Sequence, residues 1–225
     1  MNPTTLAALS TLTPLAIACF LMLAGPVRRS GKAAAILSVS AAIVSFGCAI
    51  TLLLTRPAEA LVIAVPWITA AGETIATMGL TVDGVSASMA VVVTGVAAMV
   101  QIFSLEYMRE EPPEDYGRYF TWQSLFLFSM LGLVFATDLL QLFVAWELVG
   151  LCSYLLIGFY YKKASAARAA LKAFWMTKFA DIGLLVGLLI QFTATGSFAY
   201  DAAAASAIAA AGGLTATLVA GGYFL

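Results

Sequence analysis

The chain is built from long, nearly uninterrupted runs of apolar residues separated by short polar stretches. A helix needs about 20 predominantly apolar residues to cross the hydrocarbon core of a bilayer, which is roughly 30 Å thick. Six stretches of this kind are predicted to be membrane-spanning helices: residues 5–26, 33–54, 84–105, 119–137, 139–161 and 170–193. A seventh apolar stretch begins near Gly213 and stops at Leu225, which is too short to cross a bilayer. We therefore expect the chain to be the N-terminal part of a longer protein.

Two of the polar connections carry structural signals of their own. The longest, residues 55–83, contains two short β-prone runs that meet around residues 71–73, and it predicts a small β-hairpin in a loop outside the membrane. The sequence YDAAAASAIAAA, residues 200–211, predicts a short surface helix ahead of the seventh stretch. The expected fold is an all-α polytopic membrane protein with one hairpin, in a single membrane domain over residues 1–225.

The composition agrees with a membrane location. Apolar residues make up 62% of the 225 residues, charged residues make up 10%, and the mean hydropathy is +0.99. These values lie outside the range of ordinary soluble domains. The formal net charge is -1, and neither end of the chain carries a run of like charge, so nucleic acid is not an expected partner. The expected partners are lipid, other membrane subunits and small ions.

The positions of Lys and Arg predict how the chain is threaded, because cytoplasmic loops of membrane proteins are rich in both. With the N-terminus outside, only Arg56 falls in an outside loop and Lys178 falls within a span. The other nine fall in cytoplasmic loops: Arg28, Arg29, Lys32, Arg109, Arg118, Lys162, Lys163, Arg168 and Lys172. We expect a multi-pass protein of the cell (inner) membrane with its N-terminus outside.

The residues that usually bind cofactors are scarce. Histidine, the commonest metal ligand and a frequent haem ligand, does not occur in the sequence. The cysteines Cys19, Cys48 and Cys152 stand singly in apolar runs and are predicted to be packing residues. The sequence also has no glycine-rich motif of the kind that binds phosphates or dinucleotides. We therefore expect no catalytic residue, metal or cofactor in this chain.

Three ionisable residues lie inside the predicted spans: Glu147, Lys178 and Asp181. Counting about 1.5 Å per residue from the helix ends places them about 12 to 16 Å deep, in the middle of the membrane. A charge at that depth costs roughly 2.5 to 3.5 kcal/mol and needs a partner or water. Lys178 and Asp181 are three residues apart on one helix face and can pair. Glu147 has no cation within reach on its own helix, so its partner is Lys178, a residue beyond Leu225, or a chain of waters.

These three groups are predicted to form a proton relay. A buried carboxyl such as Glu147 can change its protonation state when the distance to a cation changes, and rows of such groups are typical of proton pathways. The small residues Gly150 and Ser153 are expected to let a neighbouring helix approach. Trp146 and Tyr154 either flank this contact or are ordinary packing residues. The alternative is a structural ion pair that only fixes how the helices pack.

Three segments resemble a known family: VDGVSASM (82–89), DLLQLFVAWELVGLCSYLLIGFYY (138–161) and AALKAFWMTKFADIGLLVG (169–187). They resemble the antiporter-like membrane subunits of respiratory complex I, above all the largest and most distal of these. Related subunits occur in Mrp-type cation/proton antiporters. The resemblance implies a fold of inverted five-helix repeats, of which this chain holds the N-terminal helices and the start of the first repeat.

The resemblance also implies residue roles and partners. Glu147 matches the glutamate of the family's fifth helix, which works against a lysine on the seventh helix, beyond Leu225. Lys178 and Asp181 match the basic residue and the aspartate of the sixth helix, although arginine often stands where this chain has Lys178. The implied function is that of a non-redox, proton-translocating subunit of an NADH-quinone oxidoreductase.

Partners and cofactors follow from the same resemblance. Other complex I membrane subunits are the implied partners, and NADH, flavin, iron-sulfur clusters and quinone are expected in partner subunits. The alternative function is that of a subunit of a cation/proton antiporter or of an ion-coupled carbon-uptake system. The transported ion is a proton or sodium.

Overall fold

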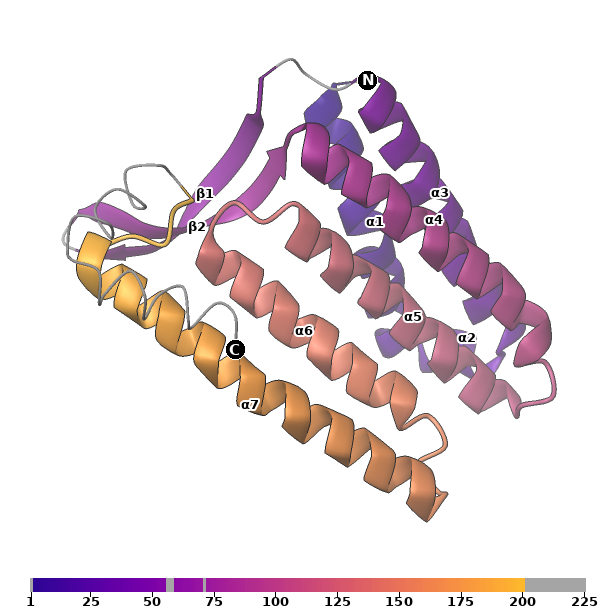
Figure 1. Ribbon diagram of the computed structural model, residues 1–225. Helices are drawn as coiled ribbons and strands as arrows, with labels where there is room; N and C mark the ends of the chain where they lie inside the picture. Colours follow the sequence, from indigo (N-terminus) through magenta and orange to yellow (C-terminus); the bar gives the residue numbers. More distant parts are fainter. Residues whose placement is uncertain (1, 56–58, 71, 201–225) are drawn as a thin grey trace.

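Long helices lie side by side, and a two-stranded hairpin covers one end of them, in the computed structural model of the chain (Figure 1). The structure describes residues 2–55, 59–70 and 72–200. The helices are α1 (Pro3–Leu23), α2 (Gly25–Arg29), α3 (Lys32–Leu54), α4 (Gly84–Tyr107), α5 (Pro113–Val134), α6 (Leu139–Ile157) and α7 (Ala164–Thr195). The antiparallel hairpin consists of β1 (Leu61–Ala70) and β2 (Glu73–Val82). The prediction of an all-α polytopic fold with one hairpin is confirmed.

Each of the six predicted spans corresponds to a long helix, but the helices differ in polarity. Among the described residues, α1, α3, α4, α6 and α7 are long and apolar enough to cross a membrane. With 22 residues, α5 is also long enough, but it carries polar side chains such as Arg118, Gln123 and Ser124. It packs against α1, α3, α4 and α6, as the central position of α5 in Figure 1 illustrates. Neighbouring helices therefore shield the most polar of the six.

Two helices begin earlier than the apolar pattern predicted. α7 starts at Ala164 instead of residue 170, so Arg168 and Lys172 lie in its first turns and not in a loop. The alanines around them are strong helix formers, which extends the helix beyond its apolar part. α5 likewise starts at Pro113, a residue type that fits the first helical turn, and Arg118 is helical.

Two other predictions concern the C-terminal part of the chain. The surface helix predicted over residues 200–211 lies outside the described residues apart from Tyr200. The seventh stretch, from Gly213 to Leu225, also lies outside them.

The hairpin is held to the helices by the first turn of α6. The side chain of Gln141 donates to the carbonyl of Gly79 and accepts from its N–H, both at 2.9 Å. One oxygen of Asp138 accepts from the backbone N–H of Thr77 at 2.5 Å and from its hydroxyl at 3.0 Å. The other oxygen of Asp138 caps α6 by accepting from the N–H of Gln141 at 2.8 Å. The predicted hairpin is confirmed, and it is anchored to the bundle.

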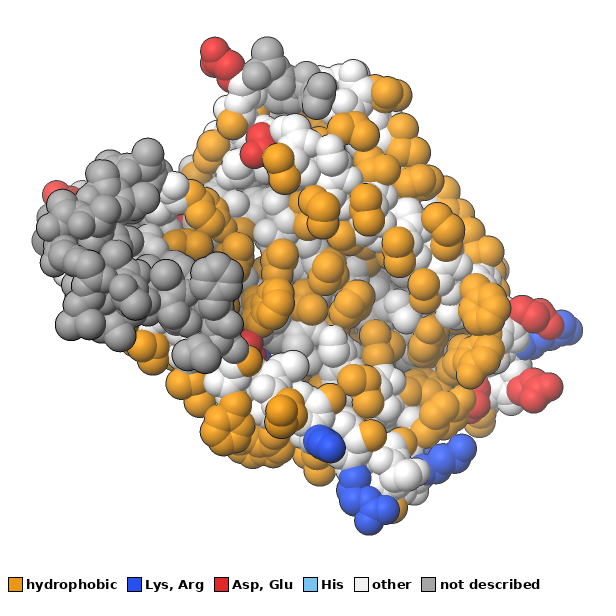
Figure 2. All heavy atoms as spheres, in the orientation of Figure 1, with side chains coloured by type: hydrophobic (Ala, Val, Ile, Leu, Met, Phe, Trp, Pro, Cys, Tyr) orange, Lys and Arg blue, Asp and Glu red, His pale blue; other side chains and the backbone are white. Residues whose placement is uncertain are grey.

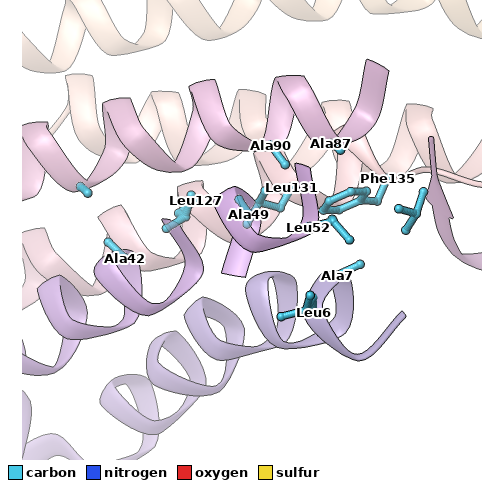
Figure 3. Close-up of a cluster of buried hydrophobic side chains, with 12 residues drawn as sticks. Leu6, Ala7, Ala42, Ala49, Leu52, Ala87, Ala90, Leu127, Leu131 and Phe135 are labelled. Atoms are coloured by element: carbon cyan, nitrogen blue, oxygen red, sulfur yellow. The ribbon is translucent and has the colours of Figure 1, made fainter. Parts of the chain in front are cut away.

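The main apolar core lies where α1, α3, α4 and α5 meet near the hairpin (Figure 3). Its labelled members are Leu6, Ala7, Ala42, Ala49, Leu52, Ala87, Ala90, Leu127, Leu131 and Phe135. Half of these residues are alanines, and such small side chains allow helix backbones to approach closely in a membrane.

A buried polar cluster joins α3, α4 and α5 further along the bundle. The hydroxyl of Ser38 lies 2.9 Å from the amide oxygen of Gln101 and 2.7 Å from the hydroxyl of Ser124. It also lies 3.0 Å from the carbonyl oxygen of Phe120. Because bilayer lipid offers no hydrogen bonds, polar side chains in this setting are stabilised by bonding between helices.

The basic residues gather at the end of the bundle opposite the hairpin. Figure 2 shows blue Lys and Arg side chains at this end, and the connections between α2 and α3, α4 and α5, and α6 and α7 all lie there. Arg29 lies 3.8 Å from Glu114 at the start of α5. A Cβ at Gly117 would collide with the carbonyl oxygen of Arg28, so glycine is needed where α2 meets α5. The nine basic residues expected on the cytoplasmic side therefore share one end, which we call the basic end.

Candidate functional site

The middle parts of α6 and α7 face each other and bring the three predicted charges together. Glu147 lies close to the middle of α6, and Lys178 and Asp181 lie close to the middle of α7. The short connection after Ile157 turns the chain back, so that α7 packs against α6 (Figure 1). The apolar residues of both helices place this contact inside the membrane.

Lys178 bridges two carboxylates that come from different helices. Its ammonium group donates to Oε2 of Glu147 across the helix contact and to Oδ2 of Asp181 at 2.9 Å. The pair of Lys178 and Asp181, three residues apart, agrees with the spacing argument. Of the three partners open to Glu147 in the sequence, the structure provides Lys178. We call Glu147, Lys178 and Asp181 the charged trio.

Trp146 provides the second hydrogen bond of the Asp181 carboxylate. Its indole N–H donates to Oδ1 of Asp181 at 2.8 Å, while Oδ2 of the same carboxylate faces Lys178. Two neighbouring residues of α6, Trp146 and Glu147, thus contact two different members of the trio. The sequence left Trp146 between a flanking and a packing role. Its depth was a usable signal, since Trp prefers the membrane interfaces and this one lies far from both helix ends.

The residues predicted to support the helix contact lie around the trio in different ways. A Cβ at Gly150 would lie 3.5 Å from Nζ of Lys178, an ordinary van der Waals distance, so Gly150 lies directly beside the ammonium group. Ser153 donates to the carbonyl of Val149 at 2.9 Å within α6. The ring of Tyr154 packs against Phe174, with centroids 5.3 Å apart.

Phe174 is a member of the site that the sequence did not suggest. Nζ of Lys178 lies 5.5 Å from the centroid of its ring, within the range of cation–π attraction. Phe174 precedes Lys178 by four residues on α7, so the two side chains share a helix face. Lys178 is therefore held by two carboxylates and one aromatic face.

The members of the trio differ in burial. The exposed fraction of the side chain is 8% for Asp181, 21% for Lys178 and 32% for Glu147. When all three are ionised, two carboxylates share one ammonium group and the trio carries one net negative charge. Such a charge is costly in a membrane interior. The trio therefore places one unbalanced negative charge between α6 and α7, with Glu147 as its most exposed member.

Within residues 2–55, 59–70 and 72–200, no group of three or more His, Cys, Asp or Glu residues is placed to hold a metal ion.

Family models match two segments of the chain. Residues 136–224 match the model described as NADH:quinone oxidoreductase/Mrp antiporter, TM, and residues 67–120 match the model described as NADH-Ubiquinone oxidoreductase (complex I), chain 5 N-terminus. The first match includes the whole charged trio, and the second includes β2 and α4. Together the two matches cover more than half of the chain.

Two of the similar proteins are named as subunits of quinone oxidoreductases. NADH-quinone oxidoreductase subunit L of Mycobacterium tuberculosis is 40% identical over an aligned length of 195, which covers 83% of this chain and 30% of the relative. NAD(P)H-quinone oxidoreductase chain 5 of Picosynechococcus sp. is 48% identical over 143 residues, 64% of this chain and 21% of the relative. The chain thus spans less than a third of the length of these relatives.

Solved structures show the same helix arrangement. A chain of the Mrp complex from Dietzia sp. superposes with a TM-score of 0.71 at 26% identity, over 95% of this chain and 23% of that one. A chain of an archaeal membrane-bound sulfane sulfur reductase superposes with a TM-score of 0.76 at 21% identity, over 96% of this chain and 43% of that one. The sequence matches and the shared fold agree, and the chain belongs to the family of antiporter-like membrane subunits found in NADH:quinone oxidoreductases and Mrp antiporters.

Proposed function

We propose that this chain is part of a proton-translocating membrane subunit of an NADH-quinone oxidoreductase, and that the charged trio is part of its proton relay. The observation that carries the proposal is Lys178, which bridges carboxylates of two helices in the middle of the membrane. The related proteins described as subunit L and chain 5 of such oxidoreductases support the assignment to this complex.

The relay works by changing which carboxylate Lys178 neutralises. While the ammonium group lies against Glu147, the glutamate is stabilised as a carboxylate. When Lys178 turns toward Asp181, Glu147 is left unpaired and takes up a proton. At 4 Å and an effective dielectric constant near 20, a charge pair interacts by about 4 kcal/mol. That energy changes a protonation equilibrium about a thousandfold, so a small movement of one side chain is enough.

The redox chemistry that drives this movement belongs in other subunits of the complex. We assign NADH, flavin, iron-sulfur clusters and quinone to partner subunits, because this chain has no histidine and its three cysteines stand far apart in the sequence. The chain itself then contributes a non-redox step. Other membrane subunits are its partners, and a change in their packing against α6 or α7 is the signal that moves Lys178.

The test uses the full-length protein in its assembled complex, reconstituted into proteoliposomes. Glu147→Gln keeps the size of the side chain and removes its charge, so electron transfer from NADH to quinone should continue while the number of protons pumped per electron falls. The matched control is Glu114→Gln, whose side chain is 72% exposed at the basic end. Normal pumping by Glu147→Gln at an unchanged ratio would rule out the relay.

A second candidate function is that of a cation/proton antiporter subunit, which the structural likeness to the Mrp complex favours. Purification of the full-length protein with its partners separates the two functions, because an antiporter complex would exchange sodium for protons in vesicles without oxidising NADH. A purely structural role for the trio predicts that Glu147→Gln and Lys178→Ala alter neither pumping nor ion exchange.

A further inference from the structure

Two adjoining cavities lie at the basic end, where the start of α5, the end of α6 and the start of α7 meet. One has a volume of about 240 Å³ and the other about 310 Å³. Arg118, Phe159 and Tyr161 line both. The two cavities therefore adjoin along these three residues, and their linings differ in chemistry.

The first cavity extends from the basic end toward the membrane interior and is mainly apolar. Trp122 lies one turn further into α5 than Arg118, and Leu155 lies nearer the middle of α6 than Phe159. Leu171 lines it from the second turn of α7. A lining of this kind fits a hydrocarbon chain.

The second cavity lies at the connection between α6 and α7 and is charged. Lys162, Lys163 and Arg118 line it together with the carboxylates of Glu111 and Asp115. Both lysine side chains are exposed, and Lys163 lies over the ring of Tyr160 at 4.8 Å. Three cations and two carboxylates therefore line this cavity.

Arg118 stands where the two cavities meet. Its Nη2 contacts the carbonyl oxygen of Phe159 at 3.2 Å and Oδ1 of Asp115 at 3.1 Å. The guanidinium carbon lies 5.2 Å from the ring centroid of Phe159 and 5.1 Å from that of Tyr161. These contacts fix the guanidinium plane, which also carries N–H donors on Nε and Nη1. A fixed guanidinium suits the oxygens of a phosphate group.

Both carboxylates of the charged cavity are already engaged by neighbouring groups. Asp115 pairs with Arg118, and Glu111 accepts a hydrogen bond of 2.7 Å from the hydroxyl of Tyr160. That hydrogen bond raises the pKa of Tyr160 to about 12, so the hydroxyl stays protonated and continues to donate. Among the described residues Lys162 and Lys163 form no ion pair, and their ammonium groups lie over the rings of Tyr161 and Tyr160.

We propose that this site binds one anionic phospholipid, with its phosphate against Arg118, Lys162 and Lys163 and one acyl chain in the apolar cavity. The two cavities follow the order of headgroup and acyl chain in a lipid, because the charged cavity lies at the end of the helices and the apolar cavity lies deeper in the membrane. Basic pockets between membrane helices bind anionic headgroups in the same manner. A soluble phosphate would use only the charged cavity and leave the apolar one empty.

The test is native mass spectrometry of the delipidated full-length protein titrated with phosphatidylglycerol. The first molecule of phosphatidylglycerol should bind with a higher affinity than the first molecule of phosphatidylcholine. The double variant Lys162→Gln with Lys163→Gln should weaken it by about fivefold for each charge removed, since a basic residue near a membrane surface contributes about that factor. Both side chains are exposed, so this variant should fold even if Arg118→Gln does not.

Two comparisons separate a lipid from other anions. Ala167→Leu, which narrows the apolar cavity, should weaken phosphatidylglycerol binding and leave the binding of inorganic phosphate unchanged. Arg109→Gln, at a side chain that is 73% exposed beside Glu106, should have no effect. Equal binding of phosphatidylcholine would overturn the proposal. The proposal would also be overturned if the Arg109 variant and the lysine variant lost the same affinity for phosphatidylglycerol. Displacement of phosphatidylglycerol by inorganic phosphate at equal concentration would overturn it as well.

Discussion

Trp146 and Glu147 are neighbours in the sequence, yet they contact different side chains of α7. Glu147 contacts Lys178, and Trp146 donates to Asp181. Because Lys178 also contacts Asp181, a change at Trp146 alters the balance between the two carboxylates without touching Glu147 itself. Trp146 is in this sense a positioning residue of the charged trio.

Trp146→Phe should lower the number of protons pumped per electron and shift the pH dependence of pumping. Phenylalanine keeps most of the ring but removes the N–H, so Asp181 competes more strongly for Lys178 and Glu147 is paired for less of the time. Hydrogen bonds to charged groups contribute about 1.5 to 3 kcal/mol, so the effect should be partial and smaller than that of Glu147→Gln. The measurement is pumping by reconstituted complex across a range of pH.

The matched control for this variant is Trp175→Phe, because Trp175 lies on the exposed face of α7. Its pH dependence should equal that of the unmodified protein. Identical pH profiles for the Trp146 and Trp175 variants would show that the indole N–H has no part in positioning.

The sequence was sufficient to predict three charged residues in the middle of the membrane, but it left open which partner Glu147 contacts and did not predict the groups that hold Lys178. Depth counting placed Glu147, Lys178 and Asp181 at one level, because ionisable residues are conspicuous in apolar helices. Trp146 and Phe174 are ordinary in such helices, so their contacts depend on how α6 is rotated against α7. Hydropathy carries no information on that rotation.

The first turn of α6 shows how a helix end can hold another element in place. Asp138 caps the helix and also binds Thr77, and Gln141 pairs with both backbone groups of Gly79. The hairpin itself was predictable from its β-prone runs. Its anchoring was not, because Gln141 stands within an apolar run and its backbone partners are more than 60 residues away in the sequence.

Gln141→Leu should loosen the hairpin while leaving the helices intact. It leaves the N–H and the carbonyl of Gly79 without their partner, and unpaired backbone groups cost about 1 to 3 kcal/mol. Limited proteolysis of the full-length protein should cut within residues 59–83 faster in this variant. Thr74→Val, at an exposed hairpin position, is the control. Equal cutting rates in both variants and the unmodified protein would contradict the anchoring role.

Over the whole molecule, the two ends differ in chemistry. The hairpin covers one end, and the helix ends and connections that carry the nine basic residues lie at the other. The sequence predicted this division because Lys and Arg are rare enough to count, and alternate connections place them on one side. The helix starts at Pro113 and Ala164 were missed because proline at the first turn and alanine-rich segments extend helices beyond their apolar part.

Cysteine labelling checks which end faces the cytoplasm. In a full-length protein whose native cysteines are replaced, Thr74→Cys in the hairpin should react with an impermeant maleimide added to intact cells. Ser165→Cys, in the first turn of α7, should react only after the membrane is permeabilised. Both positions are exposed. The reverse pattern would place the N-terminus and the hairpin on the cytoplasmic side.

The polarity of α5 affects how the chain enters the membrane during its synthesis. Strongly apolar helices pass from the translocon into lipid by their own hydrophobicity. Among the described long helices, α5 alone is not apolar enough to be recognised as a membrane span by its composition. Its Ser124 and Tyr119 bond with Ser38 of α3 and Ser104 of α4. Both of those helices leave the ribosome earlier. α5 therefore partitions into the bilayer together with helices that are already there, because the order of translation places its hydrogen-bond partners in the membrane first.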